Sequence, residues 1–191
     1  WLWQEMRDLI DSMFAIILLI ILLPFLVIIS ILIKLTSKGP VLFWSNRVGK
    51  NNQLFRMPKF RTMIIETPDV ATHLLDDPKG YYSPIGSFLR ITSLDEIPQL
   101  LSIIKGNMRF IGPRPALYNQ DDLIKLRSEK GIDMFKPGIT GWAQVNGRDN
   151  ISIPEKVHLD QEYVNNLTLR KDIQIIFMTI IKVLSKESIK H

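Results

Sequence analysis

The longest apolar run of the chain lies near its N-terminus and contains no charged residue. It covers residues 12–33, SMFAIILLIILLPFLVIISILI. As one helix this run would extend about 33 Å, enough to cross a hydrocarbon core of roughly 30 Å. A secretory signal would have a basic start and a small-residue cleavage site, and neither is present. The pattern therefore predicts that residues 1–36 form a membrane anchor.

Pro24 interrupts this apolar run. Proline removes one backbone hydrogen bond and clashes with the preceding turn, so it kinks or breaks a helix. A kinked helix would span the membrane, whereas a break would return the chain to the same face as a re-entrant hairpin. The basic residues that follow, Lys34, Lys38, Arg47 and Lys50, favour a cytoplasmic position for the rest of the chain. They do not separate the two topologies, and both stay open at this point.

Residues 37–191 show short extended and helical patterns, and we expect them to form one domain. Two extended stretches, VLFWSNRV and QLFRMPKFRTM, flank a turn signal at residues 49–52 and predict a β-hairpin. Helical patterns follow at residues 85–89, 97–104, 120–130, 154–165 and 171–186. The predicted fold class is α+β and mostly helical, with an anchor at residues 1–36 and a domain at residues 37–191.

The last helical pattern is amphipathic. Its apolar residues recur at helical spacing opposite charged and polar ones, and they are Ile173, Ile176, Phe177, Ile180, Val183 and Leu184. Such a stripe can pack on the core, which is its commoner use. It can also lie at a membrane interface with its lysines toward anionic lipid.

Composition narrows the function classes. The net charge of +5 indicates an anionic partner, such as a phosphorylated ligand, nucleic acid or the acidic face of a membrane. No nucleic acid is expected, because the basic residues are interleaved with glycine and proline rather than with stacking aromatics. The chain has no cysteine, which excludes disulfides, thiolate metal sites and a thiol nucleophile. Neither GxxxxGK[ST] nor GxGxxG occurs, so a P-loop or Rossmann nucleotide enzyme is not indicated.

The stretch SLDEIPQL places two adjacent carboxylates, Asp95 and Glu96, where a helix is predicted to begin. Ser93 and Glu96 have the spacing of a capping box, which is an ordinary structural use of these residues. It leaves Asp95 unexplained, and Pro98 would disturb a regular helix there. A helix N-terminus also favours anions such as phosphate.

Several cations occur on predicted turns and strand ends, where they could join this acidic pair. They are Lys59, Arg61, Arg90, Arg114 and Arg148. Arg114 stands between two prolines that fix its backbone, which suits bidentate phosphate binding. Two carboxylates beside several arginines suit phosphate chemistry with a divalent ion, because one can hold Mg²⁺ while the other attacks phosphorus.

Six motifs in order make the chain similar to a known family. A proline-broken apolar segment is followed by GPVLFWSNRVGKNNQLFRMPKFRTM, LRITSLDEIPQL, KGNMRFIGPRP, KPGITGWAQVNGR and DIQIIFMTIIKVL. Together they resemble the bacterial sugar transferases, the monotopic polyprenol-phosphate phosphoglycosyl transferases. The resemblance covers nearly the whole chain, and the length fits the minimal catalytic form of the family.

The resemblance implies transfer of a sugar-1-phosphate from a UDP-sugar to undecaprenyl phosphate, with release of UMP, as the first membrane step of surface glycan or glycoconjugate assembly. It implies that Asp95 is a nucleophile forming a phospho-aspartate and that Glu96 binds Mg²⁺. Substrate-binding residues carried over in the same way are Arg90 and Arg114, and more weakly Lys59, Arg61 and Arg148.

The same resemblance implies a re-entrant helix-break-helix hairpin, interfacial amphipathic helices and contact with membrane lipids. It places the protein in the bacterial inner membrane with its catalytic domain on the cytoplasmic face.

Four residues depart from the family pattern. Leu23 stands where serine is frequent, Arg7 and Asp8 stand where a Lys-Arg pair is common, and Asn107 replaces the aspartate of a frequent Gly-Asp-Met.

One alternative function is a non-catalytic, membrane-attached module that binds anionic lipid or a partner. Another is a membrane glycosyltransferase that moves only the sugar and releases UDP. The sequence identifies neither the sugar nor the oligomeric state.

Overall fold

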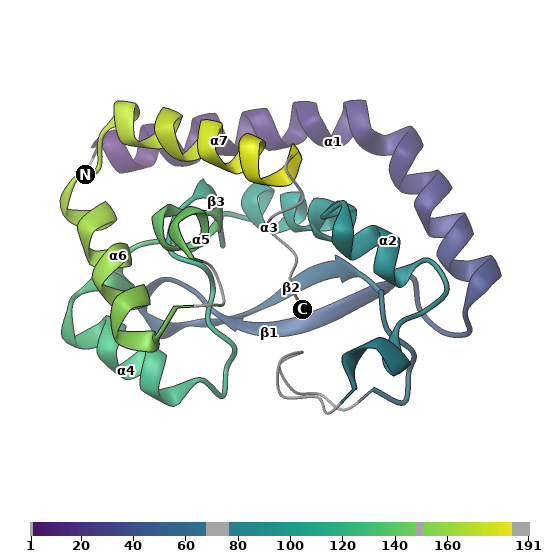
Figure 1. The fold of residues 1–191 in the computed structure, drawn as a ribbon. Coiled ribbons are helices and arrows are strands. Elements are labelled where there is room, and N and C mark those ends of the chain that lie inside the picture. The colour runs from purple at the N-terminus through teal and green to yellow at the C-terminus, as the bar shows by residue number, and fades with distance from the viewer. Residues whose placement is uncertain (1, 68–76, 148–150, 185–191) are drawn as a thin grey trace.

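The computed structural model describes residues 2–67, 77–147 and 151–184 (Figure 1). Its first element, α1 (Leu2–Thr36), is a long helix that contains Pro24. Figure 1 shows that α1 bends along its length, and an internal proline is the usual cause of a sharp helix kink. The chain therefore stays helical through Pro24 even though the proline lacks one backbone N–H, and the helix bends where the family resemblance implies a break.

The predicted β-hairpin is confirmed. It consists of β1 (Leu42–Val48) and β2 (Leu54–Phe60), which pair antiparallel from Leu42 opposite Phe60 to Val48 opposite Leu54. The turn between them contains Asn51 and Asn52 at positive φ, a conformation that asparagine tolerates better than most residues.

A second, parallel pair of strands was not predicted. It joins β3 (Arg109–Ile111) to β4 (Gly138–Thr140). The strands approach closely because glycines line the contact: a Cβ atom on Gly138 would lie 2.1 Å from the backbone nitrogen of Gly112. These glycines therefore serve backbone packing here.

The remaining elements are mostly short helices. They are α2 (Gly86–Ile91), α3 (Leu100–Ile104), α4 (Asp121–Glu129), α5 (Trp142–Asn146), α6 (Ile153–Asn165) and α7 (Leu169–Leu184), with 3₁₀ turns at Lys50–Asn52, Pro78–Tyr81, η4 (Leu94–Gln99) and Ile132–Met134. Each predicted helical pattern corresponds to a helix, with residues 185 and 186 of the last pattern outside the described residues, and α5 is an addition. The mostly helical α+β class is confirmed.

Both halves of α1 pack on the domain that follows it. Ala15, in the N-terminal half, is buried with Leu100 and Ile103 of α3. Ile29 and Ile33, in the C-terminal half, are buried in a separate cluster that also contains residues of β2 and α2. A straight helix projecting away from the domain could not make both sets of contacts.

The N-terminal end of α1 is also held by charged side chains. Arg7 donates to Asp172 of α7 at 2.5 Å. Asp8 accepts from Arg109 Nε at 2.6 Å and from Lys136 Nζ at 2.7 Å. Arg7 and Asp8, two of the residues that depart from the family pattern, therefore form ion pairs within this molecule.

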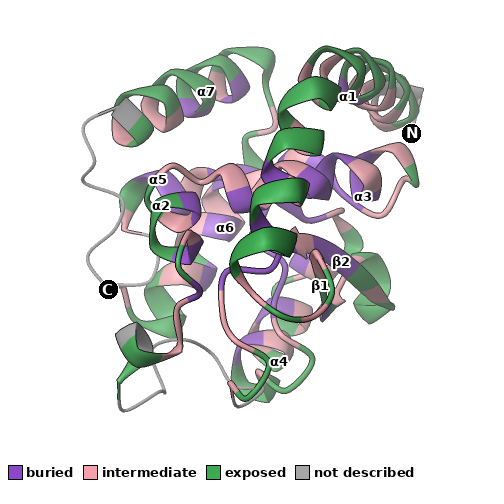
Figure 2. Cartoon of the chain, turned by 90° about the vertical axis from the view of Figure 1, so that its right-hand side faces the viewer, coloured by how far each residue is buried: buried purple, intermediate pink, exposed green. Residues whose placement is uncertain are grey.

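The outer faces of α1 and α7 are apolar and exposed (Figure 2). By length and composition, the helix from Gln4 to Thr36 is long and apolar enough to cross a membrane, and only 11% of its most apolar stretch is buried in the domain. In α7, Ile175 is fully buried while most of the apolar stripe is exposed, including Phe177 and Ile180. Most of the apolar side chains of this stripe therefore do not pack on the core.

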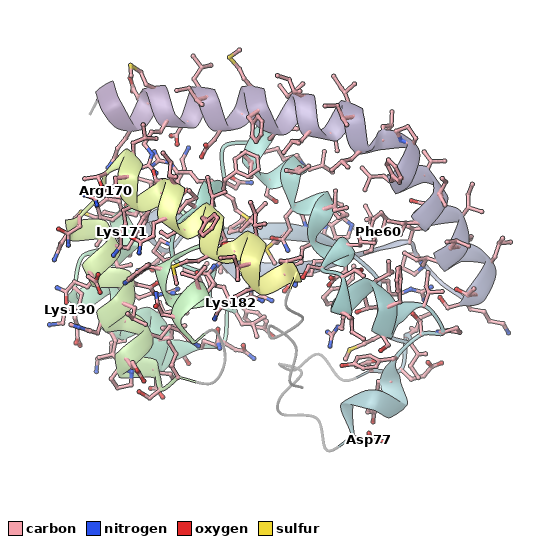
Figure 3. The ribbon with its side chains drawn as sticks, turned by 45° about the horizontal axis from the view of Figure 1, so that its top comes forward. Phe60, Asp77, Lys130, Arg170, Lys171 and Lys182 are labelled. Atoms are coloured by element: carbon pink, nitrogen blue, oxygen red, sulfur yellow. The ribbon has the colours of Figure 1, made fainter. Side chains whose placement is uncertain are left out.

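The two helices lie on the same side of the molecule, above α3, α5 and the strands (Figure 1). Figure 3 shows the side chains of α1 projecting outward from this side and labels the basic residues Arg170, Lys171 and Lys182 along α7. An apolar face with basic residues near it has the composition expected at a membrane surface.

Candidate active site

Asp95 and Glu96 lie in η4, which packs against β2. The preceding residue, Ser93, has φ +56° and its side chain makes no capping hydrogen bond. The predicted capping box is therefore wrong, because the left-handed backbone of Ser93 does not present its hydroxyl to the first free amides. Pro98 lies within the 3₁₀ turn, and regular α-helix resumes only at Leu100, so the proline is accommodated without breaking α3.

Two of the basic residues predicted to join the acidic pair lie within ion-pair distance of Glu96. Lys59 Nζ at the end of β2 lies 3.2 Å from Glu96 Oε1, and Arg114 Nη2 lies 3.8 Å from the same oxygen. Residues from three distant parts of the sequence are thus brought together by the packing of η4 on the hairpin. Burial lowers the pKa of Lys59, and the negative charge of Glu96 opposes that effect.

Asp95 is only 7% exposed. Burial raises the pKa of its carboxyl group, the charge of Lys59 opposes this and that of Glu96 adds to it, and the resulting pKa is about 6. Its carboxyl group therefore changes protonation close to neutral pH, where small changes in neighbouring charge alter the fraction that is ionised.

Arg90 also acts on Asp95, because its charge lowers the pKa of that carboxyl group. The guanidinium is oriented by Thr62 Oγ1, which accepts from Nε at 3.1 Å, and by the Tyr82 hydroxyl, which accepts from Nη1 at 3.3 Å. It also lies 5.2 Å from the centre of the Tyr82 ring. These contacts fix the orientation of the Arg90 side chain, which extends from α2.

The other two predicted cations are placed differently. Arg61 donates to the backbone of Lys38 and to the backbone and hydroxyl of Ser37, so its side chain secures the end of α1. A role for Arg61 in substrate binding stays a prediction. Arg148 lies outside the described residues, and its predicted role also stays a prediction.

The turn that carries Arg114 is supported by residues that the sequence did not single out. Arg127 Nη1 donates to the Arg114 carbonyl at 2.7 Å, and Arg127 is itself paired with the buried Asp160 at 2.6 Å. This pair fixes the Pro113–Pro115 turn from behind. Nothing in the local sequence connects Arg127 and Asp160, which lie in α4 and α6.

A pocket of about 300 Å³ adjoins Glu96 and Arg114. Its walls come from α1, η4, α3, β4, α5 and α7, and its lining residues are Leu18, Leu22, Ser93, Glu96, Ile97, Leu100, Arg114, Ile139, Thr140, Gln144, Val145, Thr179, Lys182 and Val183. The surface that it presents is mainly apolar. Sequence reasoning missed this pocket because its walls are assembled from segments far apart in the chain.

Magnesium has a suitable but incomplete set of donors here. Within the described residues no group of three or more His, Cys, Asp or Glu side chains is placed to hold a metal ion. Mg²⁺ is commonly bound by one or two carboxylates together with substrate phosphates and water. Asp95 and Glu96 supply two adjacent carboxylates, so they fit such an ion when phosphate oxygens complete its shell.

Charged side chains thus lie beside a pocket whose walls include α1 and α7, the two helices with exposed apolar faces. This arrangement suits a protein that handles phosphate next to a membrane. The bacterial sugar transferase family profile matches residues 3–186, and the chain belongs to this family.

Relatives support this assignment. The chain is 35% identical over 187 residues to exopolysaccharide production protein ExoY of Sinorhizobium fredii, covering 89% of this chain and 81% of that protein. It is 36% identical to the UDP-glucose:undecaprenyl-phosphate glucose-1-phosphate transferase of Escherichia coli, covering 90% of this chain and 39% of the relative. It is 35% identical to the undecaprenyl-phosphate galactose phosphotransferase of Salmonella typhimurium, with coverages of 93% and 40%. The chain thus spans about two fifths of these last two relatives.

Proposed function

We propose that this protein transfers a sugar-1-phosphate from a UDP-sugar to undecaprenyl phosphate and releases UMP. The observation that carries the proposal is the position of Asp95, a buried carboxyl with its pKa near 6, beside Glu96, Lys59 and Arg114. The names of the Escherichia coli and Salmonella relatives describe sugar-phosphate transfer to undecaprenyl phosphate, which agrees with such a site.

In the first step, an ionised oxygen of Asp95 attacks the β-phosphorus of the UDP-sugar. The new Asp95–phosphorus bond forms as the bond to the bridging oxygen breaks, and UMP leaves with that oxygen and its electron pair. In the second step, a phosphate oxygen of undecaprenyl phosphate attacks the same phosphorus. Asp95 leaves as a carboxylate, and the lipid carries the sugar through a diphosphate.

The cations of the site have distinct tasks in this scheme. Arg114, held by its prolines and by Arg127, binds phosphate oxygens. Lys59 and Arg90 favour the ionised form of Asp95 and offset charge that develops at phosphorus. Glu96, with Asp95 alongside, would hold Mg²⁺, which neutralises phosphate charge when bound.

We further propose that α1 is a re-entrant anchor in the bacterial inner membrane and that the domain faces the cytoplasm. The support is that both halves of the bent helix pack on the same domain, while its outer face is apolar. The Arg7–Asp172 and Asp8–Arg109 ion pairs keep the N-terminal end on the side of the domain. A nucleotide sugar from water and a lipid phosphate could then meet at one site.

The proposal is tested by incubating the purified protein with a panel of UDP-sugars, Mg²⁺ and undecaprenyl phosphate, and by identifying the nucleotide released. We expect UMP from at least one donor and its loss in Asp95→Asn, with exposed Asp122→Asn as the matched control. Release of UDP would indicate a glycosyltransferase that moves only the sugar. If folded protein releases no nucleotide with any donor, the non-catalytic, lipid-binding alternative is favoured.

A further inference from the structure

The walls of the pocket beside Glu96 and Arg114 have no task in the phosphate chemistry described above. Leu18 and Leu22 of α1 form one wall, and Thr179 and Val183 of α7 line it as well. Its volume of about 300 Å³ lies at the lower end of the range for ligand pockets. The pocket is large enough for part of a substrate.

The polar groups in these walls are mostly engaged within the protein. The hydroxyls of Thr140 and Thr179 pair at 2.7 Å, and Thr179 also donates to the carbonyl of Ile175. The amide nitrogen of Gln144 donates to the carbonyl of Ile139 at 3.4 Å, while its Oε1 is buried without a partner among the described residues. A sugar or nucleoside carries many polar groups that need partners, and these walls offer few of them. A hydrocarbon chain needs none.

The pocket adjoins both the charged groups at Glu96 and Arg114 and the exposed apolar surface, because Val183 lines it and is itself exposed. Glu96 and Arg114 are part of its lining, so a phosphate bound there would have its substituent beside the apolar walls. α1 and α7 lie on the same side of the domain (Figure 2), and residues on their outer faces, such as Ile17 and Ile180, are exposed. A chain that leaves the pocket between these helices therefore enters an apolar environment rather than water.

We propose that this pocket binds the phosphate-proximal isoprene units of the polyprenyl phosphate acceptor, between α1 and α7. The inference rests on the proposed function and adds to it the place where the acceptor chain lies. It makes α7 part of the acceptor site. By this inference, the UDP-sugar binds at the charged groups around Glu96 and Arg114 without using the apolar walls.

The test uses geranyl phosphate, a short isoprenoid phosphate that dissolves without a membrane, and the full chain in detergent. Val183→Trp and Leu22→Phe fill the pocket, while Ile180→Trp and Ile21→Phe introduce the same side chains at exposed positions of the same helices that do not line it. We expect the pocket variants to raise KM for geranyl phosphate about tenfold or more. KM for the UDP-sugar should stay within about twofold, and the surface variants should change neither value.

Binding measured by calorimetry separates this inference from the proposed function. The wild-type protein should bind geranyl phosphate more tightly than inorganic phosphate, and Val183→Trp should remove that difference. A wild-type protein that shows the difference but transfers no sugar phosphate would contradict the function and keep the chain site. Equal binding of the two phosphates would overturn the chain site, as would a higher KM for the UDP-sugar in Val183→Trp.

Discussion

The Nζ atom of Lys59 lies 3.2 Å from Oε1 of Glu96, next to the buried carboxyl group that we propose as the nucleophile. The charge of Lys59 is also the largest influence that lowers the pKa of Asp95. The positive charge of Lys59 therefore stabilises the ionised form of both carboxylates, against the desolvation that burial imposes on Asp95.

Replacing Lys59 with Met should shift the pH dependence of activity. The wild-type kcat/KM should fall as pH drops below about 6, because Asp95 must be ionised to attack phosphorus. Without the lysine charge the pKa of Asp95 rises, so the acid limb of the profile moves to higher pH. Rates measured across the pH range test this, with exposed Lys50→Met as the control. An acid limb at the same pH in Lys59→Met would contradict the assignment.

Asp95 should also make stability depend on pH. Its pKa is about 6 in the folded protein against the ordinary 3.8, so the folded state binds the proton more tightly. The stability contributed by this proton is present below the unfolded pKa and is lost as pH rises through about 6. Asp95→Asn removes the ionisation, so the variant should gain stability relative to wild type as pH rises through this window. Thermal unfolding of both proteins across it measures the effect, and parallel pH profiles would argue against a raised pKa.

The fold was predictable where local pattern determines structure. The β-hairpin has a turn signal between two extended stretches, and the helices have periodic apolar faces. The β3–β4 pair has neither, because each strand is three residues long and their contact depends on a close approach at Gly112 and Gly138. Backbone proximity of this kind leaves no periodic signal in the sequence.

The candidate site was predictable in its residues and less so in its geometry. Asp95, Glu96 and Arg114 stand out as a carboxylate pair and a proline-flanked arginine. Their contacts with Lys59 depend on how η4 packs on β2, which no local pattern reveals. The capping box failed for a local reason, because its spacing says nothing about the positive φ of Ser93.

Substitution of Ser93 should distinguish backbone conformation from capping. A non-glycine residue at positive φ costs about 1–2 kcal/mol relative to a favourable conformation, so Ser93→Gly should leave stability unchanged or raise it by up to about 1 kcal/mol. Ser93→Ala should change it by no more than about 0.5 kcal/mol, because no capping bond is lost. Denaturant unfolding of the three proteins measures these differences. A loss of about 1 kcal/mol in Ser93→Ala would restore the capping box.

Removing one partner of the ion pair between Arg7 and Asp172 should strongly destabilise the protein. Asp172 is 7% exposed and also accepts from the Tyr163 hydroxyl at 2.7 Å. Asp172→Asn leaves the arginine charge without its partner and should destabilise the protein by about 3 kcal/mol. The double change Arg7→Met with Asp172→Leu should be less destabilising than the sum of the single changes. Thermal unfolding in detergent, with exposed Asp121→Asn as the control, measures all of these, and additive effects would contradict coupling between the two residues.

The topology of α1 can be tested with single cysteines, because the chain has none of its own. Glu5→Cys and Lys38→Cys place exposed labels toward the two ends of the helix, and Lys130→Cys labels the domain. A re-entrant anchor predicts that a membrane-impermeant maleimide leaves all three unlabelled in intact cells and labels all three in inverted vesicles. Labelling of Glu5→Cys alone in intact cells would establish a membrane-spanning helix and contradict the hairpin. Pro24→Ala should shift Glu5→Cys toward labelling from outside, because straightening α1 prevents both halves from packing on one domain.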